Sequence, residues 1–430
     1  MDCYAQMLAQ LKRSPAIERF AQLYGQREGK LARQMTRYTR LVKAHEDIFH
    51  AGDKPLYLIS APGRTEIIGN HTDHNNGRVL AAAVNLDCLA AVTPRDDMQV
   101  CIRSQGYPAI ELSLEDLAVR PEEAGTSAAL VRGVAKGMSD LGFKLGGFDA
   151  AVTSDVLGGS GLSSSAAYEV MICAVLDALY NGFTMESTPR AQISQYAENV
   201  YFGKPSGLMD QMACSTGGLV TIDFKAEPVV TPLSFRFHDA GYALVVVNTG
   251  GSHDNLTPEY AAIRTEMEAV AAFFGEKVLR QVRPEQLIQQ LPALREKVGE
   301  RAILRSIHYF EENKRVKQMV QAIQNQDVLA MMKELNASGE SSWKLLQNVF
   351  CVGAEQPMTL ALALAKILLN GKGACRVHGG GFAGTTLNFV PVEQVDGFVQ
   401  QMEVVFGDHS CFVLDVRPDG AAVAFTTAEK

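Results

Sequence analysis

The chain lacks several features that would assign it at once to a familiar class. Its eight cysteines are scattered, with no C-x-x-C pair and no tight His/Cys cluster of the kind that holds zinc, so we expect reduced, mostly buried thiols. No apolar run reaches the roughly 20 residues that span a bilayer. The polar start "MDCYAQMLAQLKR" has no signal-peptide pattern. These absences predict a cytoplasmic protein that does not contact a membrane.

An excess of basic residues is also missing. Lys and Arg number 40 against 48 Asp and Glu, which leaves a formal charge of -8. Binding to nucleic-acid phosphates requires a basic surface, so we expect no nucleic-acid partner. Hydrophobic residues make up 47% and charged residues 20%, as in ordinary globular proteins. A length of 430 residues predicts two domains.

Apolar spacing predicts a mixture of helices and strands. Helices are expected over residues 1–48, 126–141, 258–274, 305–324 and 357–369, and in "AAYEVMICAVLDALY". Strands are expected in "LYLISAP", "RVLAAAVNLDCLAAVTPR", "MQVCIRS", "FDAAVTSDV", "LVTID", "YALVVVNT", "CRVHG", "TTLNFVP" and "CFVLDVRP". The pattern predicts an α+β protein. We place the domains at residues 1–225 and 226–430.

A glycine- and serine-rich stretch, "GGSGLSSSAA", joins an expected strand to an expected helix. Glycines allow a ligand to approach the backbone closely, and a helix N-terminus attracts anions. The stretch therefore suits a triphosphate, although a serine-capped helix after a glycine turn fits the spacing equally well. It is neither a G-x-x-x-x-G-K-[ST] loop nor a complete dinucleotide fingerprint. The candidate ATP-binding residues are Gly159, Ser160, Gly161, Leu162, Ser163, Ser164 and Ser165.

A second stretch, "GNHTDHNNG" at residues 69–77, crowds histidine, aspartate and asparagine side chains into a turn-forming segment. Such a segment either recognises a polar ligand or caps a loop. A polyhydroxylated ligand suits it, because hydroxyl groups both donate and accept hydrogen bonds.

Both stretches resemble motifs of the GHMP kinases, the superfamily of galactokinase, homoserine kinase, mevalonate kinase and phosphomevalonate kinase. "GLSSSAAYEV" is similar to the second motif of the superfamily, and "CRVHGGGFAGTTLNFV" is similar to the third. "GRTEIIGNHTDHNNGRVL" resembles the galactokinase sugar motif G-R-V-N-L-I-G-E-H-T-D-Y-N-G-G. "AENVYFGKPSGLMDQMACSTGG" and "NTGGSHDNLTPEYAAIR" resemble two further galactokinase segments. The resemblance runs from about residue 60 to residue 390 and indicates the galactokinase family.

This resemblance implies a fold and a reaction. It implies an N-terminal domain like the second domain of ribosomal protein S-five, a C-terminal ferredoxin-like domain, and ligands in the cleft between them. It implies a monomeric sugar 1-kinase that binds MgATP and a small sugar, with galactose expected. Asp210 matches the catalytic base and Arg64 the residue beside it, while Ser165 and Glu198 match the Mg²⁺ ligands. The implied sugar-binding positions are Asn70, His71, Asp73, Gly207 and Tyr260.

The resemblance is imperfect in the sugar motif. Asn70 stands where the family has glutamate, Glu66 where it has asparagine, and His74 where it usually has tyrosine. Loss of a carboxylate that bonds a sugar hydroxyl alters specificity, so galacturonate or another galactose-related sugar is an alternative substrate. Lys204 is a candidate partner for a sugar carboxylate. A second alternative, a regulator that binds sugar and ATP without turnover, is disfavoured by the complete run from Ser163 to Ala167.

Overall fold

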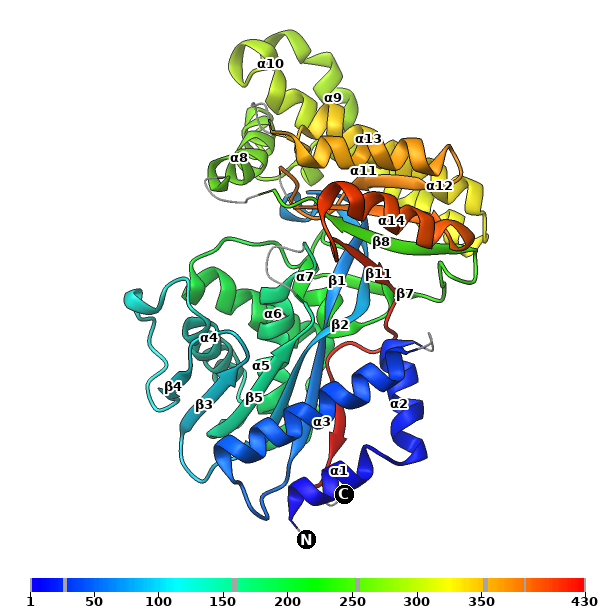
Figure 1. The fold of residues 1–430 in the computed structure, drawn as a ribbon. Coiled ribbons are helices and arrows are strands. Elements are labelled where there is room, and N and C mark those ends of the chain that lie inside the picture. Colours follow the sequence, from blue (N-terminus) through cyan, green and yellow to red (C-terminus); the bar gives the residue numbers. More distant parts are fainter. Residues whose placement is uncertain are drawn as a thin grey trace.

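The computed structural model describes residues 2–25, 29–156, 161–251, 256–350, 355–382 and 384–428. They form two lobes, each built on a β-sheet covered by helices, and both chain ends lie at the lower end of the first lobe (Figure 1). The predicted mixture of helices and strands is confirmed. In the described part of the chain, no helix combines the length and the apolar character that crossing a bilayer requires.

The first lobe begins with the helices predicted for residues 1–48. They are α1 (Cys3–Gln10), α2 (Ser14–Tyr24) and α3 (Lys30–Phe49). The strands of this lobe are β1 (Tyr57–Ile68), β2 (Arg78–Pro94), β3 (Gln99–Ser104), β4 (Ile110–Ser113), β5 (Phe148–Ser154), β6 (Leu219–Asp223), β7 (Val229–Leu233) and β12 (Ala422–Thr426). Its other helices are α4 (Ser127–Asp140), α5 (Ser164–Tyr180), α6 (Ser187–Tyr196) and α7 (Met209–Thr216), with shorter turns at η1 (Asp73–Asn75), η2 (Pro121–Glu123) and η3 (Ala197–Phe202).

The second lobe holds a smaller sheet and most of the remaining helices. Its strands are β8 (Tyr242–Asn248), β9 (Ala374–Val377), β10 (Thr385–Pro391) and β11 (Cys411–Leu414). Its helices are α8 (Thr257–Phe273), α9 (Pro284–Gln289), α10 (Leu291–Lys297), α11 (Glu300–Gln324), α12 (Val328–Ser341), α13 (Pro357–Leu369) and α14 (Val395–Phe406), with turns at η4 (Leu279–Gln281), η5 (Ser342–Leu346) and η6 (Val392–Gln394).

The first sheet has the strand order β12-β1-β2-β5-β3-β4, and the long β2 also pairs with β6, which in turn pairs with β7. Its pairs are antiparallel except for β3 with β5. Strands β7 and β12 both come from beyond residue 225, so this sheet takes strands from both sides of the predicted boundary. The boundary itself stays a prediction.

Strand β1 is longer than the predicted "LYLISAP" and continues to Ile68, so it includes the first six residues of the sugar motif. Eleven of its twelve residues are buried, so the polar–apolar alternation that marks a half-exposed strand is absent. Alternate residues face two different cores: Leu58 packs with α1–α3, whereas Ile59 packs with the core that includes α5. The strand therefore carries Arg64 and Glu66 in a rigid, buried setting.

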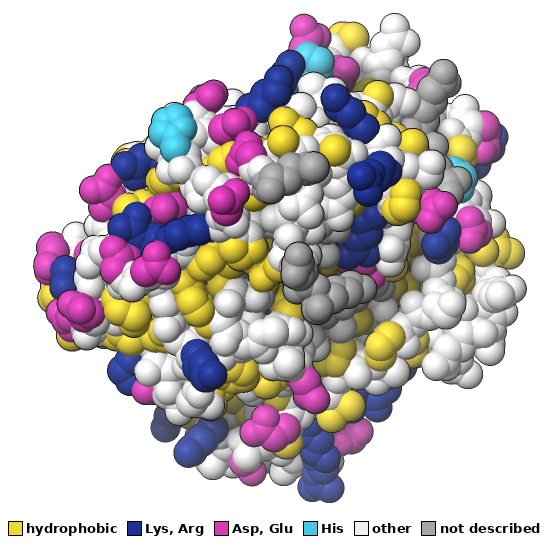
Figure 2. All heavy atoms as spheres, turned by 90° about the horizontal axis from the view of Figure 1, so that it is seen from below, with side chains coloured by type: hydrophobic (Ala, Val, Ile, Leu, Met, Phe, Trp, Pro, Cys, Tyr) yellow, Lys and Arg dark blue, Asp and Glu magenta, His cyan; other side chains and the backbone are white. Residues whose placement is uncertain are grey.

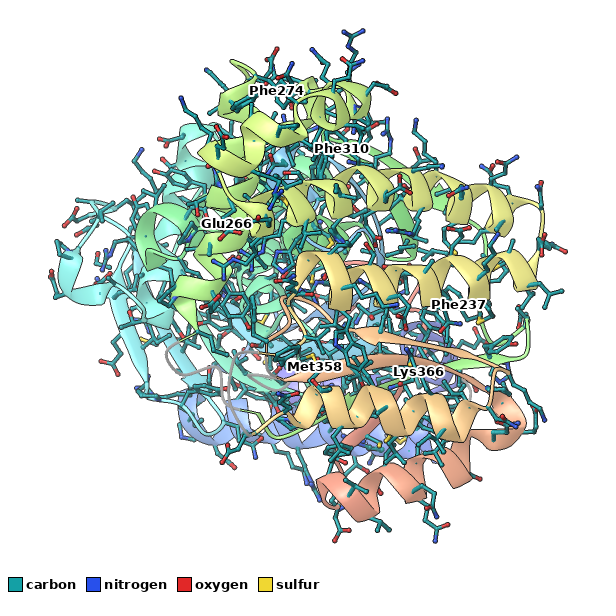
Figure 3. The ribbon with its side chains drawn as sticks, turned by 90° about the horizontal axis from the view of Figure 1, so that it is seen from above. Phe237, Glu266, Phe274, Phe310, Met358 and Lys366 are labelled. Carbon is teal, nitrogen blue, oxygen red and sulfur yellow. The ribbon has the colours of Figure 1, made fainter. Side chains whose placement is uncertain are left out.

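The four-stranded second sheet has the order β11-β8-β10-β9 and is antiparallel. Helices α13 and α14 cover one face, where Val245 packs with Met358. The other face belongs to the core that contains Val246 and Met331 of α12. Figure 3 shows the helices of this lobe from above, with Met358 and Lys366 on α13. The sheet is thus enclosed on both sides.

Exposed charges of both signs are mixed on the surface. Lys and Arg side chains lie among Asp and Glu side chains on the face seen from below (Figure 2). Ion pairs such as Arg103 with Glu111 and Lys54 with Asp96 join some of the exposed groups in the described regions. Exposed pairs of this kind contribute little stability, at most about 1 kcal/mol each.

One buried charged group connects the N-terminal helices to the rest of the first lobe. The carboxylate of Asp87, which is fully buried, accepts hydrogen bonds from Tyr24 Oη at 2.5 Å and Arg37 Nη1 at 2.5 Å. Ser60 also donates to it, and Arg417 Nη1 lies 3.3 Å away. Burial raises the pKa of Asp87, but Arg37 and Arg417 outweigh it and hold the pKa below its ordinary value.

Replacing Asp87 with alanine is expected to lower the free energy of unfolding by about 3–5 kcal/mol, because Arg37 and Arg417 lose a buried counter-charge. Glu111→Ala, which breaks the exposed pair with Arg103, is the control and is expected to change it by less than about 1 kcal/mol. Urea unfolding of the three proteins measures both effects. Equal stability of the two variants would contradict this role of Asp87.

Candidate active site

The segment "GNHTDHNNG" forms the turn that joins β1 to β2. Gly69 has φ 112°, and a Cβ there would lie 2.7 Å from the carbonyl oxygen of Arg78, so glycine is required. Thr72 Oγ1 donates to the carbonyl oxygens of Gly69 and Arg78 at 3.0 and 2.7 Å. His71 also has a positive φ of 56°. The turn is thus closed by its own side chains and presents His71 and Asp73, both half-buried.

Arg64 and Asp210 form a two-point ion pair next to this turn. Arg64 Nε donates to Asp210 Oδ1 at 2.7 Å, and Arg64 Nη2 donates to Oδ2 at 2.6 Å. The third nitrogen, Nη1, donates to the carbonyl oxygen of Gly161 at 2.5 Å. Burial raises the pKa of Asp210, but Arg64, Ser163 and Lys204 outweigh it and lower the pKa. Asp210 is therefore held as a carboxylate in the first turn of α7.

The serine-rich stretch meets the same carboxylate. Ser163, at the N-cap of α5 with φ 58°, donates its hydroxyl to Asp210 Oδ2. Ser164 and Ser165 form the first turn of α5, where free backbone N–H groups attract anions. The predicted residues Gly159 and Ser160 lie outside the described residues. The structure thus brings Gly161 and Ser163 directly to Asp210 and Arg64.

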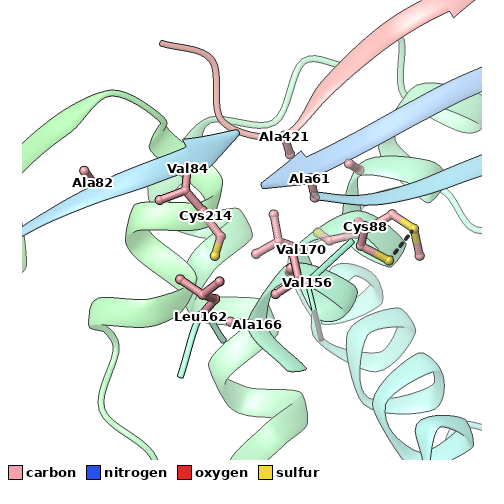
Figure 4. Close-up of a cluster of buried hydrophobic side chains, with 14 of the residues drawn as sticks. Ala61, Ala82, Val84, Cys88, Val156, Leu162, Ala166, Val170, Cys214 and Ala421 are labelled. Carbon is pink, nitrogen blue, oxygen red and sulfur yellow. Dashed lines mark hydrogen bonds between the residues drawn. The ribbon is translucent and has the colours of Figure 1, made fainter. Parts of the chain in front are cut away.

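A buried apolar cluster packs against the segments that carry Arg64, Ser163 and Asp210. Leu162 and Ala166, at the start of α5, are buried in the same cluster as Cys214 of α7 (Figure 4). The cluster also contains Ala61 of β1. Because close-packed side chains resist displacement, this core fixes the loop, the Asp210 helix and the Arg64 strand relative to one another.

Ser165 and Glu198, the predicted metal ligands, lie together. Ser165 Oγ donates to Glu198 Oε1 at 3.0 Å, and Lys204 Nζ lies 3.0 Å from the same oxygen. Gln211 Nε2 donates to Glu198 Oε2 at 2.8 Å. Among the described residues no group of three or more His, Cys, Asp or Glu side chains is placed to hold a metal. One hydroxyl and one carboxylate nevertheless suit Mg²⁺, which keeps several water ligands.

Behind Glu198 lies a second carboxyl group that the sequence analysis did not single out. Glu169 is fully buried and accepts a hydrogen bond from Gln211 Nε2 at 3.1 Å. Burial, and then the charge of Glu198, raise the pKa of Glu169 well above its ordinary value. Gln211 therefore bridges two carboxyl groups and orients Glu198. Glu169 stands in the quoted motif segment "AAYEV" and Gln211 in "MDQ", so the motifs themselves could have indicated these two residues.

Three consecutive backbone carbonyl oxygens of the glycine-rich third motif accept hydrogen bonds from side chains. Asn70 Nδ2 donates to Gly379 at 2.7 Å, His71 Nε2 contacts Gly380 at 2.9 Å, and Tyr260 Oη donates to Gly381 at 2.7 Å. The second lobe thus holds the sugar motif of the first.

Two of these positions have no room for a side chain. A Cβ at Gly380 would lie 2.6 Å from the Tyr260 ring, and one at Gly381 would lie 2.1 Å from the carbonyl oxygen of Asn348. Glycine is therefore needed for the three-carbonyl arrangement.

Asn70 is fully buried and its carboxamide is occupied by the protein itself. Its Nδ2 also donates to both carboxylate oxygens of Glu66, at 3.1 and 3.2 Å, and its Oδ1 accepts from Asn348 Nδ2 at 2.8 Å. Glu66 in turn accepts from Arg376 Nη2 at 2.8 Å. The family motif has asparagine at position 66 and glutamate at position 70. This chain has the reverse, Glu66 and Asn70, and the two side chains are hydrogen-bonded to each other.

Asp73, Gly207, His71 and Tyr260 remain half-buried at the surface of this region. A Cβ at Gly207 would lie 1.8 Å from Asp73 Oδ2, so the backbone of Gly207 lies directly against the Asp73 carboxylate. A carbonyl oxygen can only accept, so the contact with Gly380 requires the proton on His71 Nε2. Burial lowers the pKa of His71, and the neutral ring leaves Nδ1 as an acceptor.

The chain is similar in sequence to known sugar kinases. Residues 43–94 match the galactokinase galactose-binding signature, and residues 128–218 match the GHMP kinases N-terminal domain. A galactokinase of Actinobacillus pleuropneumoniae serotype 5b is 34% identical over 368 residues, which cover 84% of this chain and 91% of that protein. The chain belongs to the galactokinase family. A galactokinase of Streptomyces coelicolor is 32% identical over 83% of this chain and 90% of that protein.

Solved structures agree with the galactokinase fold. Lactococcus lactis galactokinase, determined with galactose, aligns with a TM-score of 0.74 at 22% identity and covers 95% of this chain and 99% of its own. A mevalonate kinase aligns with a TM-score of 0.60 at 14% identity, over 84% of this chain and 98% of its own. The predicted two-domain α+β GHMP kinase fold is confirmed. As a galactokinase-family protein, the chain is an ATP-dependent sugar kinase.

The titration of Asp73 gives a test of the galactokinase site. Burial, and then the charge of Asp210, raise the pKa of Asp73 to about 6. Protonation turns one oxygen of the carboxylate into a hydrogen-bond donor and weakens it as an acceptor for sugar hydroxyls. We expect kcat/KM for the sugar to fall as the pH drops below about 6, and Asp73→Asn to lose this acid limb. An unchanged acid limb in the variant would assign the titration to another group.

Proposed function

We propose that this protein transfers the γ-phosphate of ATP to the anomeric hydroxyl of galactose. The observation that carries the proposal is the Arg64–Asp210 pair: Ser163 of the serine-rich turn donates to Asp210, and the charge of Asp210 also acts on Asp73, which lies against Gly207. A phosphate-binding turn and a hydroxyl-binding turn therefore meet at one carboxylate. The galactose bound in the aligned Lactococcus lactis structure supports the choice of sugar.

Asp210 acts on the sugar hydroxyl in this proposal. The carboxylate accepts a hydrogen bond from the anomeric hydroxyl and orients its oxygen toward the γ-phosphate. It takes the proton as the new oxygen–phosphorus bond forms and the bond from the γ-phosphorus to the bridging oxygen breaks, so that ADP leaves. Its lowered pKa makes it a weak base. That suffices, because phosphoryl transfer passes through a loose transition state with little bonding to the attacking oxygen. Arg64 keeps Asp210 ionised and adds positive charge near the transferred group.

The triphosphate lies at the N-terminus of α5 in this proposal, against the backbone of Gly161 and Leu162 and the hydroxyls of Ser163, Ser164 and Ser165. Gly159 and Ser160, which lie outside the described residues, remain predicted ATP-binding residues. Ser165 and Glu198 would hold Mg²⁺, which would neutralise phosphate charge when bound. Gln211 orients Glu198 through its hydrogen bond at 2.8 Å.

His71, Asp73, Gly207 and Tyr260 form the sugar side of the site. His71 Nδ1 and the Asp73 carboxylate are acceptors for sugar hydroxyls, and the backbone of Gly207 lies beside them. Asn70 serves as a positioning residue, because its carboxamide is already bonded to Glu66, Gly379 and Asn348. The case for galacturonate depended on a missing carboxylate at position 70. The carboxylate of Glu66 stands within 3.2 Å of Asn70 Nδ2, so no observation favours that substrate.

Asp210→Asn tests the role of the base. We expect kcat to fall by about 10²–10⁴-fold, since the amide cannot accept the proton, while the Kd for nucleotide changes little. ADP release is measured with galactose, N-acetylgalactosamine, galacturonate, glucose and arabinose. Asp223→Asn is the control, because Asp223 pairs with Arg78 and Arg280 at the end of β6. Turnover by Asp210→Asn at the wild-type rate would refute the assignment, and inactivity of wild type on galactose would refute the substrate.

The exchanged pair of Glu66 and Asn70 makes a separate prediction. Asn70→Glu places a carboxylate against Glu66 and against the carbonyl oxygen of Gly379, so we expect a loss of stability and a higher KM for galactose. Adding Glu66→Asn removes the like charge, and we expect it to recover about 0.5–3 kcal/mol as a coupling energy. Thermal unfolding and galactose kinetics of both single variants and the double variant measure it. Strictly additive effects would contradict a direct bond between the two residues.

A further inference from the structure

Lys204 lies in the site but has no role in the proposed mechanism. It lies in the segment between η3 and α7, and its backbone N–H donates to the carbonyl oxygen of Glu198 at 3.1 Å. Its ammonium lies 3.0 Å from Glu198 Oε1, the same oxygen that accepts from Ser165. The Lys204 side chain is 60% exposed, whereas that of Glu198 is 3% exposed. The lysine thus reaches from solvent to a buried carboxylate.

The charges around this ammonium are mostly negative. Glu198, Asp210 and Glu169 all raise the pKa of Lys204, against the lowering effect of burial. Lys204 in turn is one of the groups that lower the pKa of Asp210, together with Arg64. The ammonium therefore lies within electrostatic range of both the proposed metal ligand and the proposed base.

Arg64 is not available to a second anion in the way that Lys204 is. Its three nitrogens all donate to Asp210 or Gly161, and its side chain is only 7% exposed. The ammonium of Lys204 stands on a flexible four-carbon stem with three donor hydrogens. If the ammonium leaves Glu198, that carboxylate keeps its bonds from Ser165 and Gln211. Lys204 can therefore move without leaving Glu198 unpaired.

We propose that Lys204 is a phosphate-binding residue of this kinase. Its ammonium holds Glu198 while nucleotide is absent and moves to an oxygen of the triphosphate when nucleotide binds. This inference rests on the proposed nucleotide position at Ser165 and Glu198. An ATP site with carboxylates at Glu198 and Asp210 repels a metal-free triphosphate unless a cation faces it. Lys204 supplies that cation from within the chain.

The test is calorimetric titration with adenylyl imidodiphosphate, a non-hydrolysable ATP analogue, in the presence of a chelator and without sugar. A charge-assisted hydrogen bond is worth about 1.5–3 kcal/mol, which corresponds to a loss of at least about tenfold in affinity for Lys204→Met. Lys204→Arg keeps the charge and is expected to recover part of the affinity. Lys54→Met is the matched control, because Lys54 also pairs with a carboxylate, Asp96, at 2.9 Å.

Two results would overturn the proposal: equal metal-free affinity of Lys204→Met and wild type, or no metal-free binding by wild type. Thermal unfolding checks that the variant is folded, which we expect because Ser165 and Gln211 still donate hydrogen bonds to the buried carboxylate of Glu198. Since the titration uses no sugar, it remains decisive even if galactose is not the substrate. If the wild-type protein binds the analogue but fails to phosphorylate galactose, the proposed substrate is refuted. The comparison of Lys204→Met with wild type still decides the role of Lys204.

Discussion

The ion pair between Arg64 and Asp210 is the interaction on which the site depends. One guanidinium joins β1, the turn before α5 and the first turn of α7, which are separated by about 100 and then 50 residues along the chain. Arg64 is only 6% exposed, and a buried cation without its partner is strongly destabilising. The same contact therefore maintains the packing of the first lobe and the geometry of the proposed catalytic site.

The second lobe contributes mainly backbone to the site. Carbonyl oxygens of Gly379, Gly380 and Gly381 receive Asn70, His71 and Tyr260, and two of the glycines are required because a Cβ would collide with neighbouring atoms. Side chains on the sugar side are thus oriented by a loop more than 300 residues away from the sugar motif. The phosphate side, in contrast, is built within the first lobe. In the proposed mechanism, docking of the two lobes therefore determines how the sugar meets the nucleotide.

The sequence predicted the motifs well and their supporting contacts poorly. The family pattern identified Arg64, Ser163, Glu198 and Asp210, which the structure brings together, because each stands in a local run with recognisable spacing. The C-terminal half of β1, residues 63–68, was missed because both faces of the strand are buried and the alternation that marks a half-exposed strand disappears. The pairing of β12 with β1 joins positions more than 350 residues apart, and local spacing cannot indicate such a partner.

The exchange of Glu66 and Asn70 shows why a single motif position is a weak guide to specificity. Compared position by position with the family motif, the chain has lost a carboxylate at residue 70. The carbonyl oxygen of Gly379 lies 2.7 Å from Asn70 Nδ2, and a carboxylate there could offer it no hydrogen. Arg376, fully buried, requires a counter-charge, which Glu66 provides at 2.8 Å. The loop conformation therefore demands a donor at position 70 and an anion at position 66. In the proposed function, discrimination between sugars then falls to the half-buried groups His71, Asp73 and Tyr260.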